Sequence, residues 1–134
     1  DFPDVKIDDG FQLSIHDWMR KSRVIIADTN QTVYLESLAL NKPTIIYWNK
    51  NCNEIDRNAK PIFEDLEEVG IYQKSPVLAA KMLSKVYKNI DHWWLDHNTQ
   101  IIRKRFLSKY VALSDNWRLE WENLLRNIII DEKK

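Results

Sequence analysis

Two short apolar runs separated by one helix-length segment constrain the fold more than any other feature of the sequence. Residues 24–27 end at Asp28, and residues 44–48 are introduced by Pro43. Short apolar runs of this kind are typical of strands that are buried on both faces. The intervening residues 32–41 are rich in helix formers and can cross back over a sheet. The pattern therefore predicts a right-handed strand–helix–strand unit within a parallel α/β core.

Caps and periodicity predict the neighbouring elements. Residues 71–73 are a third expected strand, and residues 5–7 are a weaker candidate. A helix is expected over 14–21 with Ser14 as its N-cap, and another over 59–69. The sequence thus predicts a short parallel sheet with helices packed on it.

Residues 75–130 are expected to form a helical extension. Ser75 is the predicted N-cap of its first helix, and Pro76 occupies the first helical position. Helical spacing then predicts a second helix from Trp94 to Tyr110 and a third that begins near Asp115. Because a few strands can pack only a limited number of helices, the last of these need another surface.

Composition excludes several classes of function. The 134 residues contain 20 basic and 20 acidic side chains, so no net positive charge favours nucleic acid. The single Cys52 cannot form an internal disulfide, which predicts a cytoplasmic protein. No apolar stretch is long enough to span a membrane, although peripheral association with one stays open. We expect residues 1–134 to be one domain, excised from a longer chain because Asp1 is not a methionine.

The segment from Asp28 to Thr32 is the predicted ligand site. It follows the first strand and precedes a helix, and ligands of open α/β sheets bind at that edge. Free N–H groups at a helix start favour an anion such as a diphosphate. The site residues are expected to be Thr29, Asn30, Gln31 and Thr32. The alternative is an ordinary turn with Thr32 as helix cap.

Glu36 adds a carboxylate to this segment. A capping box begun by Thr32 would need an acid at position 35, which is Leu35. At a spacing of four residues, Thr32 and Glu36 share a helix face. A hydroxyl beside phosphate and a carboxylate near ribose could then bind one nucleotide. The alternative is a solvated surface glutamate.

These residues resemble the donor-nucleotide motif of GT-B glycosyltransferases. The resemblance rests on residues 22–28 (SRVIIAD), Thr32 and residues 35–45 (LESLALNKPTI). More narrowly, the chain is similar to bacterial surface-polysaccharide transferases described as the LIC-type family. The narrower resemblance extends to residues 91–94 (DHWW), Gln100, Phe106 and Tyr110, and covers roughly residues 22–121. The glycines that often precede the donor helix are replaced here by Asn30 and Gln31.

The resemblance implies a Rossmann-like C-terminal domain that binds a nucleotide-sugar as substrate and needs no other cofactor. Glu36 would bind ribose, and Thr32 would lie near the phosphates. A sugar or glycolipid acceptor would come from an N-terminal domain, so this chain alone would be inactive. A polyol-phosphate transferase of the teichoic-acid type and a non-catalytic α/β scaffold are the alternatives.

Other polar and aromatic residues receive structural interpretations. His16, His92 and His97 lack the spacing of a zinc site, and no metal is expected. The catalytic residues are not identified and any base is expected from the other domain; Asp28, His92 and Asp96 are the candidate bases only if this chain alone transfers sugar. Trp117 and Trp121 are interpreted as core or interdomain packing. The basic residues 103–105 are interpreted as a solvated helix face.

Overall fold

A three-stranded parallel sheet forms the centre of the computed structural model, which describes residues 13–48, 54–111 and 113–131. Its strands are β1 (Ile25–Ala27), β2 (Thr44–Tyr47) and β3 (Tyr72–Gln73), in the order β1-β2-β3. Each is one residue shorter than its expected run. The predicted parallel α/β class is confirmed, whereas the strand candidate at residues 5–7 and Cys52 lie outside the described residues.

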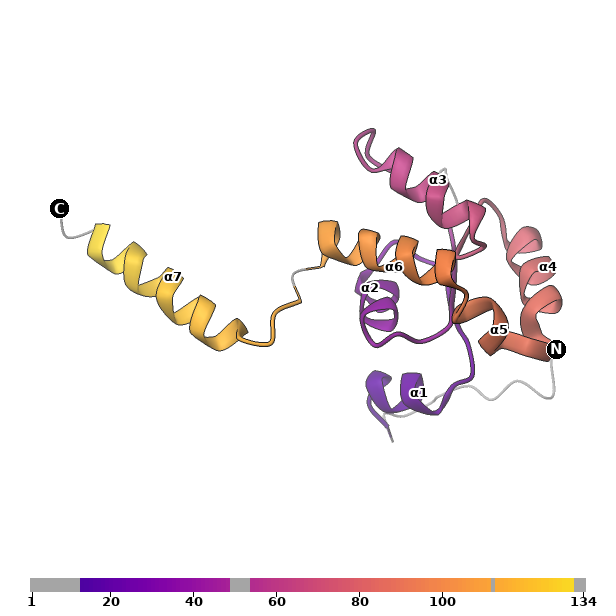
Figure 1. Ribbon diagram of the computed structural model, residues 1–134, viewed down its shortest axis with the longest axis horizontal. Coiled ribbons are helices and arrows are strands. Elements are labelled where there is room, and N and C mark those ends of the chain that lie inside the picture. The colour runs from indigo at the N-terminus through magenta and orange to yellow at the C-terminus, as the bar shows by residue number, and fades with distance from the viewer. Residues whose placement is uncertain (1–12, 49–53, 112, 132–134) are drawn as a thin grey trace.

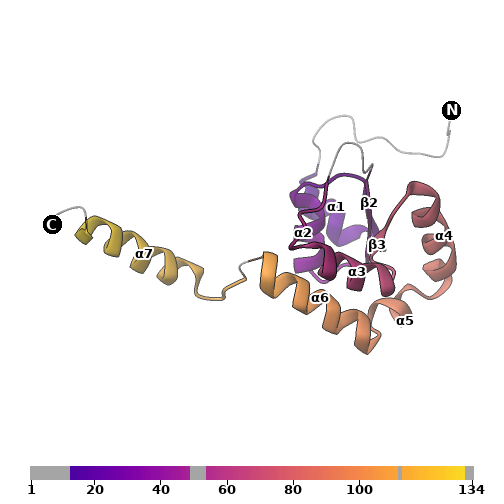
Figure 2. The ribbon, with the colours of Figure 1, turned by 90° about the horizontal axis from the view of Figure 1, so that it is seen from above.

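Helices cover both faces of this sheet. The described helices are α1 (Ile15–Lys21), α2 (Thr32–Ala39), α3 (Lys60–Glu68), α4 (Pro76–Val86), α5 (Ile90–Trp94), α6 (His97–Tyr110) and α7 (Trp117–Asp131). The chain crosses through α2 from β1 to β2 and through α3 from β2 to β3. Helix α6 packs across α2 and α3 on one side, while α4 packs on β2 and β3 from the other (Figure 2).

The core lies between the sheet and helices α2, α3 and α6. Leu38, Ile46 and Leu66 are fully buried there. An aromatic cluster fills the centre, in which the ring centroids of Trp48 and Tyr72 lie 5.1 Å apart. Phe106 brings α6 into the same cluster through ring contacts with α2 and α3. Burial of these rings holds α2, α3 and α6 against the sheet.

The predicted N-caps are confirmed at two helices. The Ser14 hydroxyl accepts a hydrogen bond from the Asp17 N–H at 3.2 Å, and that of Ser75 accepts one from Leu78 N–H at 3.2 Å. Both caps satisfy donors that the helix itself leaves unpaired.

The predicted continuous helix from Trp94 to Tyr110 is wrong, because the chain breaks at Leu95 and Asp96. The Asp96 carboxylate accepts hydrogen bonds from the N–H groups of Asn98 and Thr99, and so starts α6 as a new helix. Trp94 consequently ends the short α5 and is buried in the core. An aspartate N-cap explains the break, since it satisfies the first donors of the following helix.

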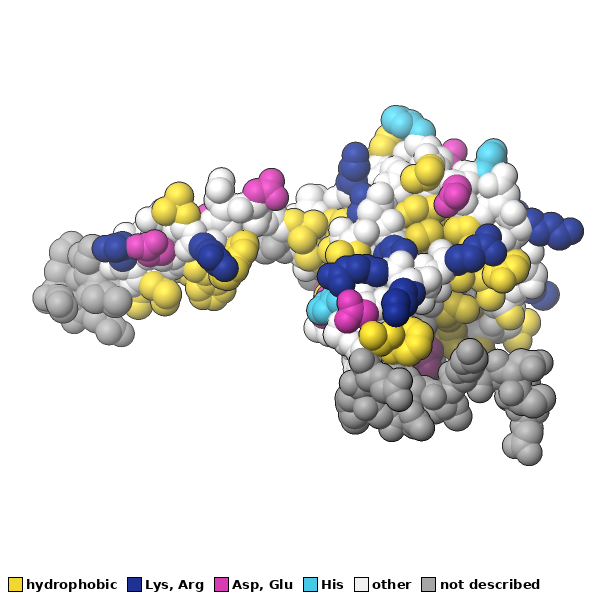
Figure 3. Space-filling model, turned by 90° about the horizontal axis from the view of Figure 1, so that it is seen from below, with side chains coloured by type: hydrophobic (Ala, Val, Ile, Leu, Met, Phe, Trp, Pro, Cys, Tyr) yellow, Lys and Arg dark blue, Asp and Glu magenta, His cyan; other side chains and the backbone are white. Residues whose placement is uncertain are grey.

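Helix α7 extends away from the sheet and its helices (Figure 1). Trp117 and Trp121 are 55% and 58% exposed, so they do not belong to the core of the described residues, and their interdomain packing stays a prediction. Hydrophobic side chains are visible along the helix (Figure 3). Among the described residues, no helix is both long and apolar enough to cross a bilayer.

Gly70 ends α3 in a left-handed conformation, with φ of 82°. A Cβ atom at this position would also lie 2.9 Å from the Met82 Sδ atom. We therefore expect Gly70→Ala to lower the free energy of unfolding by about 1–2 kcal/mol, measured by urea denaturation. Asparagine tolerates this backbone region, so Gly70→Asn should cost less than alanine despite its Cβ. Equal losses would assign the effect to the Met82 contact instead of the backbone.

Candidate functional site

The predicted ligand segment lies at the carboxyl end of β1. Residues 28–31 form the bend between β1 and α2, and their side chains are exposed. Thr29 and Gln31 make no side-chain hydrogen bond within the described residues. The edge of the sheet at which open α/β folds bind ligands therefore presents short polar side chains to solvent.

The start of α2 is not capped by a side chain. The N-cap residue is Gln31, which has extended backbone angles and makes no capping hydrogen bond. The expectation that Thr32 caps this helix is wrong, because Thr32 is its first helical residue. The first N–H groups of the helix are therefore without a side-chain cap and, together with the exposed Thr32 hydroxyl, could donate to an anion.

Asn30 is held in place by the first turn of α2. The buried Tyr34 hydroxyl donates to Asn30 Oδ1 at 3.2 Å. Burial raises the pKa of the Tyr34 phenol, and the nearby Tyr110 raises it further, so the phenol remains protonated and able to donate. The Asn30 amide N–H groups make no hydrogen bond within the described residues and could bind a ligand.

Glu36 lies one turn further along α2 and contacts a histidine of another helix. The His16 Nε2 atom of α1 lies 3.0 Å from Glu36 Oε2, and both side chains are partly exposed. The other carboxylate oxygen makes no hydrogen bond within the described residues. Sequence reasoning did not assign His16 to this site. No periodic pattern links residues 20 positions apart on two separate helices.

The other polar residues of the motif have structural roles. The Thr44 hydroxyl lies 2.7 Å from the Lys42 carbonyl and 3.1 Å from Ser37 Oγ, which itself donates to the Tyr34 carbonyl. Both hydroxyl residues are fully buried. The Lys42 ammonium donates to the Arg20 carbonyl at 2.9 Å. These contacts join α2 to β2 and α1. Within residues 35–37 (LES), Glu36 is therefore the polar side chain that faces outward.

Side chains from α5 and α6 hold the C-terminal end of α2. The Trp94 indole N–H lies 3.0 Å from the carbonyl and side-chain oxygens of Asn41, which has φ of 54°. Arg103 donates to the Leu38 carbonyl at 2.6 Å, and Gln100 joins Arg103 to the Trp94 carbonyl. Cationic donors at a helix C-terminus satisfy unpaired carbonyls and complement the helix dipole.

The interpretation of residues 103–105 as a solvated face is wrong for Arg103. Its side chain is buried, and burial lowers the pKa of its guanidinium, which nevertheless remains charged. Lys104 is exposed, and Arg105 pairs with Asp65 of α3. Helical periodicity places Arg103 one turn before the buried Phe106, a signal that could have indicated its inward position.

Two of the three candidate bases lie far from the ligand segment along the strand direction. His92 and Asp96 line a cavity beside Gly70, at the amino end of β3. Because the strands are parallel, this is the end opposite to the ligand segment. Asp28 alone of the three adjoins that segment. Within the described residues, no group of three His, Cys, Asp or Glu side chains could hold a metal ion.

Comparison with known proteins places this arrangement in a family. The model of the LIC12162 family transferase matches residues 1–125. The chain belongs to the LIC12162 transferase family. The resemblance inferred from residues 22–121 is thereby confirmed at the level of that family. No curated protein and no solved structure matches this transferase.

The contacts of Arg103 predict a specific loss of stability. In this transferase, Arg103→Met should reduce the free energy of unfolding by about 1–3 kcal/mol, because the Leu38 carbonyl loses its charged donor and keeps only backbone N–H donors such as that of Asn41. Lys104→Met is the matched control on the same helix. Since Lys104 is exposed, its substitution should change stability by no more than about 0.5 kcal/mol. Equal urea midpoints for the two variants would contradict the role of Arg103.

Proposed function

We propose that this transferase moves a sugar from a nucleotide donor to a hydroxyl group during bacterial surface-polysaccharide synthesis. In this proposal the described chain binds the donor. The acceptor is held by another domain of the enzyme. Membership of a transferase family supports the transfer of a group. The carboxyl end of β1 and the uncapped N-terminus of α2 support the assignment of the donor site.

Glu36 carries the proposal. It is the carboxylate of α2, while Ser37, Thr44 and Lys42 are engaged in holding that helix. Its free oxygen can accept hydrogen bonds from ribose hydroxyls, and Thr32 lies one turn closer to the helix start on the same face. Glu36 lies about one helical turn, roughly 5.4 Å along the axis, behind the start of α2, so a nucleotide with its phosphates at the helix start could place its ribose near this carboxylate.

The donor phosphates are assigned to the start of α2. Its first N–H groups and the hydroxyls of Thr29 and Thr32 can donate to a diphosphate, and the helix dipole favours negative charge there. Asn30, oriented by Tyr34, adds a further amide donor. These groups stabilise the charge that develops on the diphosphate as it departs.

The transfer itself forms one bond and breaks one. The acceptor oxygen attacks the anomeric carbon, the bond from that carbon to the diphosphate oxygen breaks, and a base takes the hydroxyl proton. Asp28 adjoins the donor segment, but the base is assigned to the domain that holds the acceptor. Alignment of the two reactants across a cleft would supply much of the acceleration.

Replacement of Glu36 tests the donor site directly. Glu36→Gln should leave the fold intact and weaken nucleotide binding by about 10-fold to 100-fold, because one charge-assisted hydrogen bond to ribose is lost. Calorimetry with UDP, GDP, CMP and CDP measures the effect. Glu64→Gln, at an exposed position of α3, is the matched control and should bind as tightly as the unaltered protein. An unchanged affinity of Glu36→Gln would remove Glu36 from the site.

The histidines of the chain report where the nucleotide binds. Because His16 touches Glu36, nucleotide bound there should shift the ring signals of His16 in a magnetic resonance titration. His92 and His97 lie on α5 and α6, away from the end of β1, and should be unaffected. Shifts at His92 without shifts at His16 would place the nucleotide at the opposite end of the sheet and contradict the proposal.

A further inference from the structure

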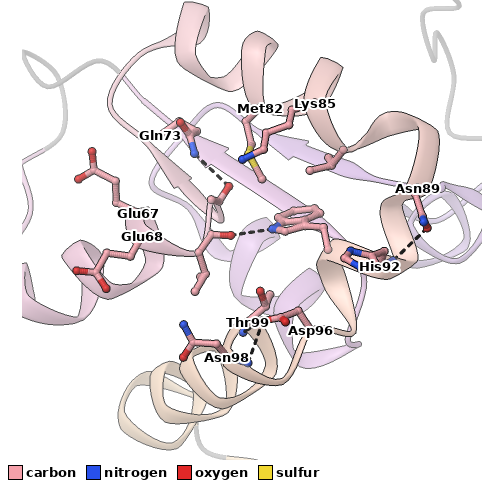
Figure 4. Close-up of a pocket in the computed structure, with 14 residues that line it drawn as sticks. Glu67, Glu68, Gln73, Met82, Lys85, Asn89, His92, Asp96, Asn98 and Thr99 are labelled. Carbon is pink, nitrogen blue, oxygen red and sulfur yellow. Dashed lines mark hydrogen bonds between the residues drawn. The ribbon is translucent and has the colours of Figure 1, made fainter.

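A second cavity lies at the amino end of β3, away from the donor segment. Its volume is 720 Å³, and it is lined by the ends of α3 and α4, by α5 and by the start of α6 (Figure 4). The side chains of Asn98 and Thr99 lie on one side of it, with Met82 and Lys85 on the opposite side (Figure 4). Gln73 of β3 and Asn89 also line it, so several separate elements converge on one hollow.

Several polar groups in this cavity have no partner within the described residues. Thr99 as a whole is only 3% exposed, but its hydroxyl oxygen is accessible to solvent and makes no hydrogen bond within the described residues. A ligand in the cavity could therefore replace the water that hydrates this hydroxyl. The side chains of Glu68, Lys85 and Asn98 are likewise without hydrogen-bond or ion-pair partners. Both donors and acceptors are therefore available to one bound molecule.

The charges and the helix start argue against an anion. The N-terminus of α6 is already capped, because Asp96 accepts from the N–H groups of Asn98 and Thr99. Glu67 pairs with Lys74, whereas Glu68, Asp96 and Lys85 make no ion pair within the described residues, so negative charge is in excess around the cavity. A phosphate would meet the carboxylates of Asp96 and Glu68 without a free helix N-terminus to compensate.

Part of the cavity wall is apolar and lies beside these polar groups. Trp93 is fixed in orientation, because its indole N–H donates to the Val69 carbonyl at 2.7 Å. Trp93 and Met82 both line the cavity and offer an apolar surface beside the polar groups. A pyranose ring has the complementary pattern, with hydroxyls that donate and accept around its edge and C–H groups on its faces.

We propose that this cavity binds a neutral pyranose residue of a glycan. The inference rests on the proposed role in polysaccharide synthesis, which supplies the ligand. Since the cavity and the donor segment lie at opposite ends of a parallel sheet, the bound residue is not the reacting one. The cavity instead holds a more distant part of the glycan and keeps it attached to the enzyme.

Sugar titration in the absence of nucleotide tests this site. Methyl glucoside, methyl galactoside and N-acetylglucosamine are added separately while the indole signal of Trp93 is followed by magnetic resonance. At least one should bind with a millimolar dissociation constant. Asn98→Ala and the isosteric Thr99→Val should each weaken that binding by about tenfold, as expected for one lost hydrogen bond. Asn127→Ala, at an exposed position of α7, is the matched control and should bind normally.

The possible outcomes separate this site from the donor site. No shift of Trp93 with any of the three sugars, or unchanged binding by both cavity variants, would overturn the glycan site. A saturable response to inorganic phosphate without a response to sugars would also overturn it. Sugar binding is measured without nucleotide, and nucleotide binding of Glu36→Gln is measured without sugar, so either proposal can fail while the other stands.

Discussion

Side chains from more than 50 residues later in the chain bind the C-terminal end of α2, beside the backbone N–H groups that follow the helix. Arg103 donates to the Leu38 carbonyl, and Trp94 binds Asn41 in its left-handed conformation. Arg103 and Trp94 are buried, and the bond from Arg103 to Leu38 is formed away from competing water. This anchoring joins α2 to α5 and α6 and fixes the helix that carries the candidate donor residues.

The two ends of α2 differ because only one of them is anchored. Its C-terminal end is enclosed by tryptophan, glutamine and arginine, whereas its N-terminal end has no capping side chain. The uncapped donors and the exposed Thr32 and Glu36 then lie on a helix that cannot easily shift. A binding site gains affinity when its groups are held in position before the ligand arrives. The contact between His16 and Glu36 adds a second helix to that fixed arrangement.

The sheet presents different chemistry at its two ends. At the carboxyl end of β1, short polar side chains and free helix donors suit an anion. At the amino end of β3, Asp96 already occupies the donors of α6, and the carboxylates of Asp96 and Glu68 outweigh the ammonium of Lys85. Parallel strands produce this separation, because all their carboxyl ends lie at one edge. A donor and a glycan chain could therefore be held by one domain without competition for the same groups.

The sequence by itself determined the strands, the crossover helix and the caps at Ser14 and Ser75, because these depend on local apolar runs and on side chains within one helical turn. It also determined the candidate segment from Thr29 to Glu36, since that segment must follow β1. It could not place His16 beside Glu36 or turn Arg103 inward to Leu38, because both contacts join separate helices. Helical spacing predicted one continuous helix across Asp96, but this residue forms an N-cap and starts a new helix. Only tertiary packing decided these features, since they depend on which helix faces meet across the sheet.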